Sequence, residues 1–140
     1  FPSVSTMKPL VYQGRKIANY FVDTDGNAWS LKQGRTRQLA TFVTGVKGKY
    51  PTINLYDSGR HVTAAIHRVV AESLIKRPRP KQIRPAIWKL LNEEEKSLIY
   101  QAYEVNHIDH DPLNHHPSNL EWVSRKTNLD KRNAHYGYLQ

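Results

Sequence analysis

The chain has 140 residues, enough for one domain with a real core or for two small modules that share one. Its 21 Lys and Arg against 12 Asp and Glu give a net charge of +9, which favours a polyanionic partner, although a merely basic protein fits equally well. The absence of cysteine excludes disulfides and thiolate-bound zinc. With no apolar run as long as a membrane span and no signal-peptide core, we expect a cytoplasmic protein without a membrane partner.

Residues 1–15 are expected to form an N-terminal extension. The six residues before Met7, the only methionine, are a candidate cloning remnant and are left out of the fold prediction. From residue 16 to 75, turn signals such as Asp25-Gly26-Asn27 and Asp57-Ser58-Gly59 recur at spacings typical of an antiparallel meander. The expected strands are 19–22, 28–31, 38–44, 50–56 and 61–65.

The apolar period then changes from that of strands to that of a helix. Ile66, Val69, Val70, Ser73 and Leu74 lie on one face of a helix, which cannot continue through Pro78 and Pro80. Residues 76–103 are therefore expected to be a basic linker followed by a helical insertion. The linker contains five basic residues and no acidic one: Lys76, Arg77, Arg79, Lys81 and Arg84.

Two interpretations of this linker stay open. It is either a solvated connector or an extended segment that follows a phosphate backbone.

In the insertion, Asn92 followed by Glu93, Glu94 and Glu95 predicts the start of a second helix. The insertion either packs on the C-terminal module or forms a dimer contact, and the sequence does not choose between them.

Polar side chains are concentrated between two short alternating segments, residues 104–107 and 120–123, which are expected to pair as strands. Pro112 and Pro117 exclude a continuous helix between them, so the polar side chains are expected on a loop. Ser124 is a suitable N-cap for a basic helix that ends near residue 134. The segment contains four of the seven histidines: His107, His110, His115 and His116.

Three elements in this order resemble a known family. Val105-Asn106-His107-Ile108-Asp109, Asn119-Leu120-Glu121-Trp122-Val123 and Asn128 resemble the HNH nucleases with the ββα-metal fold, especially the phage and intron-borne homing type. Residues 20–31 and the helix 66–72 are similar to the module that often precedes HNH in those proteins. The resemblance implies an α+β protein: an antiparallel N-terminal meander with one helix (16–75), the helical insertion (76–103) and a ββα-metal module (104–140).

The resemblance also implies an activity, metal-dependent DNA cleavage, and a role for each matching residue. His107 would be the general base, and Asn119 would tie the loop to the strand. Asn106 and Asn128 would hold the metal, expected to be one Mg²⁺ per active site with Mn²⁺ able to substitute. Asp109 would either complete the metal site or organise the loop, and the loop role is favoured.

The expected partner is double-stranded DNA, with homodimerisation through the helical insertion as a further expectation, in a phage-encoded protein that acts in a bacterial host. Two rival functions are a non-catalytic DNA-binding protein on an HNH scaffold and a structural zinc module that uses His110, His115 and His116. Nicking and double-strand cleavage both stay open. The residues expected to contact DNA are Lys76, Arg77, Arg79, Lys81, Arg125, Lys126, Lys131, Arg132 and His135.

Overall fold

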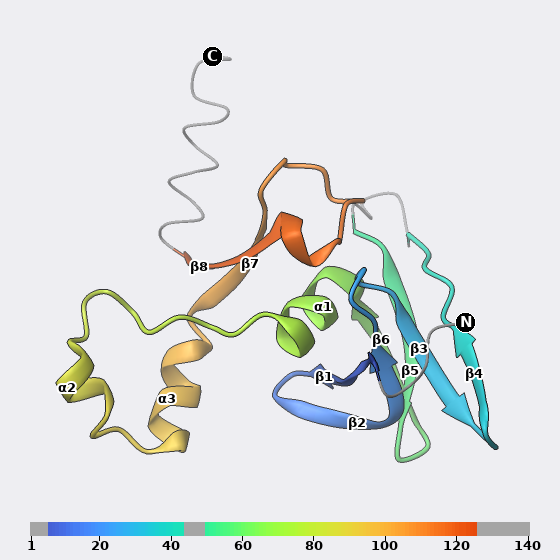
Figure 1. Cartoon of the computed structure of the whole chain (residues 1–140), viewed down its shortest axis with the longest axis horizontal. Coiled ribbons are helices and arrows are strands. Elements are labelled where there is room, and N and C mark those ends of the chain that lie inside the picture. The colour runs from blue at the N-terminus through green and yellow to red at the C-terminus, as the bar shows by residue number, and fades with distance from the viewer. Residues whose placement is uncertain (1–5, 44–49, 126–140) are drawn as a thin grey trace. The chain divides into compact units, whose positions relative to one another are not determined.

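The structure is a computed structural model that describes residues 6–43 and 50–125 (Figure 1). The chain divides into two compact units. The first consists of Phe1–Lys76 and His107–Glu121, and the second of Arg77–Asn106 and Trp122–Gln140. Among the described residues, no helix combines the length and the apolar character that a membrane span requires.

The first unit begins with an antiparallel sheet of four strands in chain order: β1 (Lys8–Tyr12), β2 (Arg15–Val22), β3 (Ala28–Lys32) and β4 (Arg35–Gln38). For these strands the antiparallel meander predicted from turn spacing is confirmed, with two differences, whereas the later strands of the predicted meander form a separate sheet. Lys8–Tyr12 lies in the sheet and not in an extension, because the fully buried side chain of Leu10 joins the core. The predicted strand 38–44 is wrong: β4 ends where it was expected to begin. Gln33 and Gly34, both at positive φ, form a two-residue hairpin turn, so the fourth strand begins at Arg35, earlier in the sequence than predicted.

A hairpin and a helix complete the core of this unit. Strands β5 (Thr52–Asp57) and β6 (Arg60–Ala65) pair along their whole length, and α1 (Ile66–Leu74) follows without a break. The helix spans the predicted apolar face and packs against β1. Ser73, on its apolar face, accepts a hydrogen bond from the Val11 amide at 2.9 Å. The largest fully buried side chains are Leu10, Val22, Ile53, Leu55, Ile66, Val69 and Val70.

The second unit contains the helical insertion, α2 (Pro85–Trp88) and α3 (Glu93–Tyr100). Asn92 caps α3 as predicted: its side chain accepts from the Glu95 amide at 2.8 Å, and the Glu95 carboxylate accepts from the Asn92 amide at 3.0 Å. Two linker arginines have partners within this unit. The Arg77 guanidinium lies 4.0 Å from the centre of the Trp122 ring, and Arg79 donates to the Ile83 carbonyl.

Strands β7 (Tyr103–His107) and β8 (Leu120–Ser124) form a two-stranded sheet, which confirms the predicted strand–loop–strand order. The loop between them, residues 108–119, ends in a short 3₁₀ helix, η2 (Pro117–Asn119). Tyr103, expected in the insertion, begins β7 instead, because its ring is buried. The predicted basic helix lies outside the described residues, and with it Lys126, Asn128, Lys131, Arg132 and His135.

Candidate functional site

The loop after His107 is held by a network of short polar side chains. Asn119, only 8% exposed, accepts a hydrogen bond from the Asp109 amide at 3.1 Å and donates to the Asp109 carboxylate and the Asn114 carbonyl, both at 2.9 Å. Asp109 also accepts from the Asn114 side chain at 2.9 Å and from the Asp111 amide at 2.8 Å. These bonds tie the two ends of the loop together.

The Asp109 carboxylate is therefore engaged in organising the loop. The hydrogen bond from the Asn114 side chain, followed by those from the Asp111 amide and Asn119, holds its pKa below the ordinary value, so it is ionised at neutral pH. The next carboxylate, Asp111, accepts from the Leu113 amide at 3.0 Å. Both aspartates thus cap backbone amides, the role that the sequence favoured for Asp109.

His107 ends β7 and is only 7% exposed. Its Nε2 is buried without a hydrogen-bond partner, whereas Nδ1 is not among the buried unpartnered atoms of the described chain. Because no hydrogen bond to the ring is present among these residues, Nδ1 is the nitrogen that solvent reaches. Burial lowers the pKa of His107, and the carboxylates of Asp109 and Asp111 only partly oppose this effect. The imidazole is consequently neutral at cellular pH.

Two aromatic side chains from distant parts of the first unit contact the His107 ring. Tyr50 stacks on it with ring centres 5.6 Å apart, and His67, in the first turn of α1, lies 4.9 Å away. From the sequence, His67 is expected only as part of the helix 66–72 and Tyr50 only as part of the strand 50–56. Neither has a local signal that could have placed it beside His107, since the contacts arise only when Tyr50 and α1 meet the end of β7.

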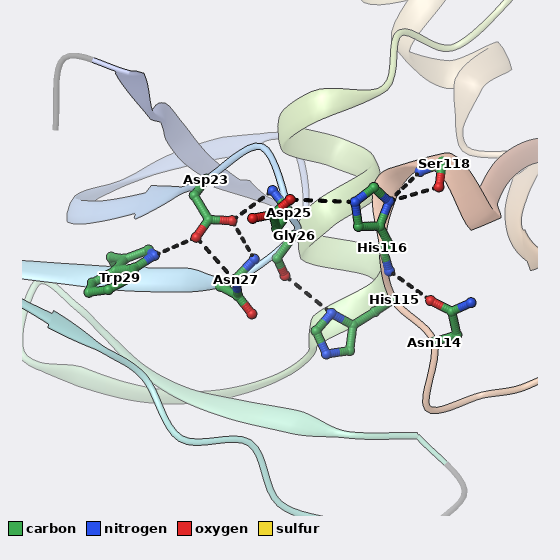
Figure 2. Close-up of polar contacts among 9 residues, drawn as sticks. All are labelled: Asp23, Asp25, Gly26, Asn27, Trp29, Asn114, His115, His116 and Ser118. Atoms are coloured by element: carbon green, nitrogen blue, oxygen red, sulfur yellow. Dashed lines mark hydrogen bonds and ion pairs between the residues drawn. The ribbon is translucent and has the colours of Figure 1, made fainter. Parts of the chain in front are cut away.

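The loop also docks on the turn between β2 and β3, as Figure 2 shows. His115 Nδ1 lies 3.2 Å from the Gly26 carbonyl, and His116 Nε2 lies 3.6 Å from the Asp25 carboxylate. Gly26, at φ +86°, leaves no room for a side chain: a Cβ there would lie 2.7 Å from the His115 carbonyl oxygen. A glycine at this turn therefore allows the close approach of the loop.

The turn that receives the loop is built around Asp23, which is 7% exposed. Its carboxylate accepts from the amides of Asp25 and Asn27, both at 2.9 Å, and from the Trp29 indole at 2.8 Å (Figure 2). Burial raises the pKa of Asp23, but these hydrogen bonds outweigh it and leave the pKa below its ordinary value. The turn predicted from Asp25-Gly26-Asn27 is thus held in place by hydrogen bonds to the Asp23 carboxylate.

The predicted site residues outside the linker fall into three groups. His107, Asn119 and Asp109 lie together at the foot of the loop. Asn106 precedes His107 in β7 and is half-buried, and Arg125 donates to Glu104 at 3.1 Å. The remaining residues of the basic helix, Asn128 included, are outside the described part of the chain. Within that part, no group of three or more histidine, aspartate or glutamate side chains is arranged to hold a metal.

Comparison with known proteins agrees with this arrangement. Residues 94–130 match the family model described as HNH endonuclease. The chain is also similar to a solved structure from work on DNA binding and cleavage by the HNH homing endonuclease I-HmuI, at a TM-score of 0.63 and 22% identity. The match covers 92% of this chain and 58% of that one, so the chain spans little more than half of that protein's length. No curated protein matches the sequence significantly. In the sequence of residues 94–130 this chain is therefore similar to HNH endonucleases, and in its α+β fold it is similar to an HNH homing endonuclease, which confirms the resemblance predicted from its motifs.

Proposed function

We propose that this chain is a metal-dependent endonuclease that hydrolyses phosphodiester bonds in double-stranded DNA. The observation that carries the proposal is His107, a neutral imidazole with one solvent-reachable nitrogen, at the foot of a loop that Asn119 ties in place. It lies within the segment that matches the HNH endonuclease family. The proposal extends to a phage-encoded protein that acts in the cytoplasm of a bacterial host, and to dimerisation through the helical insertion.

His107 acts as the general base in the proposed reaction. Its Nδ1 accepts a proton from the water that attacks phosphorus, because Nε2 is buried and no water can reach it. A pKa below 6.5 keeps most of the imidazole deprotonated at cellular pH, so the base is ready without a preceding proton loss. Asn119 and Asp109 hold the loop through hydrogen bonds, and this fixes the direction in which the strand presents the ring.

The available donors fit a hard divalent cation, proposed to be one Mg²⁺ with Mn²⁺ able to substitute. Asn106 and Asn128 would hold it through amide oxygens, the ligand type that Mg²⁺ prefers over imidazole. When bound, the ion supplies charge stabilisation to the scissile phosphate and the leaving oxygen. Because both ligands are neutral and Asp109 is engaged in the loop, DNA phosphates would have to supply the negative charge of the site.

The neutral ligand pair also favours a second candidate function, a DNA-binding protein that no longer cleaves. One experiment separates the two. Supercoiled plasmid is incubated with the parent and with His107→Ala, with and without Mg²⁺, and nicked and linear products are measured beside DNA affinity. We expect metal-dependent cleavage by the parent and none by His107→Ala, with affinities within about 3-fold of each other, because a general base acts in the transition state.

The outcomes have distinct meanings. Binding without cleavage by the parent would establish the non-catalytic function, and undiminished cleavage by His107→Ala would remove His107 from the reaction. Zinc in the purified protein would revive the structural zinc module. The imidazoles of His115 and His116 are turned to Gly26 and to Asp25 and Ser118, which does not support that module.

A further inference from the structure

Two buried imidazole nitrogens without partners lie on neighbouring rings of the first unit. They are Nε2 of His107 and Nδ1 of His67. The ring centres are 4.9 Å apart, with an angle of 50° between the ring planes. A buried polar atom without a partner is destabilising, so two of them on neighbouring rings require an explanation.

The spacing of the rings fits a hydrogen bond between these two atoms. A ring nitrogen lies roughly 1 Å from the ring centre, so a bond of about 2.9 Å between two such atoms places the centres about 5 Å apart. The observed 4.9 Å between the ring centres therefore fits such a bond. Because each nitrogen lacks any other partner, one bond satisfies both.

We propose that His67 is a positioning residue for His107, whose Nε2–H donates a hydrogen bond to Nδ1 of His67. This inference rests on the proposed function, in which His107 is the general base. The bond fixes the His107 tautomer with its proton on Nε2 and leaves the lone pair on Nδ1, the nitrogen that meets water. His67 thus takes the place of the carboxylate or backbone carbonyl that commonly orients a catalytic histidine.

The protonation state of His67 suits an acceptor. Burial lowers its pKa to about 4, with smaller contributions from His107 and Arg68, so the ring is neutral at cellular pH. Its Nε2 is not among the buried unpartnered atoms of the described chain and can carry the proton, which leaves the lone pair on Nδ1.

Tyr50 packs against both rings of the histidine pair. Its ring centre lies 4.6 Å from that of His67 and 5.6 Å from that of His107, so one aromatic ring packs against both imidazoles. Such packing limits the rotation of the two rings and reduces competition from water for the bond between them. The two imidazoles are therefore held by the ring of Tyr50 and by the proposed hydrogen bond between them.

The bond can be observed without any measurement of cleavage. In the full chain with ¹⁵N-labelled histidine, nuclear magnetic resonance should show a slowly exchanging proton on His107 Nε2 and a scalar coupling from that nitrogen to His67 Nδ1. A His107 ring protonated on Nδ1, or the absence of the coupling, would overturn the proposal even if the protein cleaves DNA. Conversely, failure of the parent to cleave would remove the nuclease function and leave the coupling measurement valid.

Two substitutions of His67 distinguish a hydrogen-bond acceptor from a packing ring. His67→Asn keeps an oxygen acceptor near the place of Nδ1 but loses the ring, whereas His67→Phe keeps a ring and loses the acceptor. We expect His67→Phe to slow single-turnover cleavage about 10- to 100-fold at unchanged DNA affinity, and His67→Asn to stay within about 5-fold of the parent. A role in packing alone predicts the reverse order.

A control substitution tests whether loss of any histidine in this unit has the same effect. His61, exposed on β6, contacts Asn54 and Tyr56 and takes no part in the site. His61→Phe should cleave like the parent. If His67→Phe also cleaves like the parent, or if it outperforms His67→Asn, the positioning role is refuted.

Discussion

Replacement of Gly26 by alanine should destabilise the first unit and impair cleavage together. The added Cβ would lie 2.7 Å from the His115 carbonyl oxygen and 3.1 Å from Pro117 Cδ. Neither atom is the end of a flexible side chain, so the turn and the loop must separate by several tenths of an ångström. The positive φ of +86° adds a conformational cost of roughly 1–2 kcal/mol.

Gly59 provides a matched control for this substitution. It has a similar φ of +80°, but nothing lies within 4 Å of the position that a Cβ would occupy. Gly59→Ala should therefore lose only the conformational part of the stability. Overpacking of a close contact costs roughly 1–3 kcal/mol, so Gly26→Ala should exceed Gly59→Ala by about that amount.

The assay measures urea unfolding and plasmid cleavage for the parent and both variants. Cleavage is compared at a temperature where all three are folded, so that any difference reports the placement of the loop and not the folded fraction. A displaced loop moves the elements that hold His107, and a misplacement of about 1 Å can cost roughly 10²-fold in rate. Equal stability and equal cleavage for Gly26→Ala and Gly59→Ala would refute the idea that the β2–β3 turn positions the loop.

Three further predictions concern charge. Asn106→Asp should lower the Mg²⁺ concentration needed for half-maximal cleavage, since a carboxylate attracts the ion more strongly than an amide. If the Mg²⁺ titrations of parent and variant superimpose, residue 106 is not a metal ligand. Asp23 has a folded pKa below its ordinary value, so its contribution to stability is present above that ordinary value and is lost as pH falls through the folded pKa. Urea midpoints between neutral and acid pH should therefore fall less for Asp23→Asn than for the parent, and an equal fall in both would contradict this role of the carboxylate. Lys76 and Lys81 are exposed, and their joint replacement by Gln should reduce the slope of log K for DNA binding against log salt concentration by up to about 1.8. An unchanged slope would mean that the linker is only a spacer. Arg77→Gln should instead lower the Tm, because Arg77 stacks on Trp122.

The sequence by itself determined the elements whose causes are local. The apolar spacing from Ile66 to Leu74 predicted the helix α1, and Asn92 with the three glutamates after it predicted the start of α3. The two prolines of the loop, together with the alternation around it, defined β7, the loop and β8. In each case the residues that set the structure are within a few positions of one another, so their preferences are visible without the rest of the chain.

The tertiary structure decided the contacts between residues that are far apart in sequence. Leu10 belongs to the core only because β1 pairs with β2 and packs against α1. No short-range sequence pattern predicts that Leu10 is buried. Gly26 meets His115 across 89 positions, and His67 meets His107 within the same unit. Which distant residues come into contact depends on how the apolar surface of the whole unit is buried, and this is a property of the folded unit and not of any short segment. The sequence therefore indicated candidate residues for the proposed chemistry, whereas the fold decided which side chains surround them.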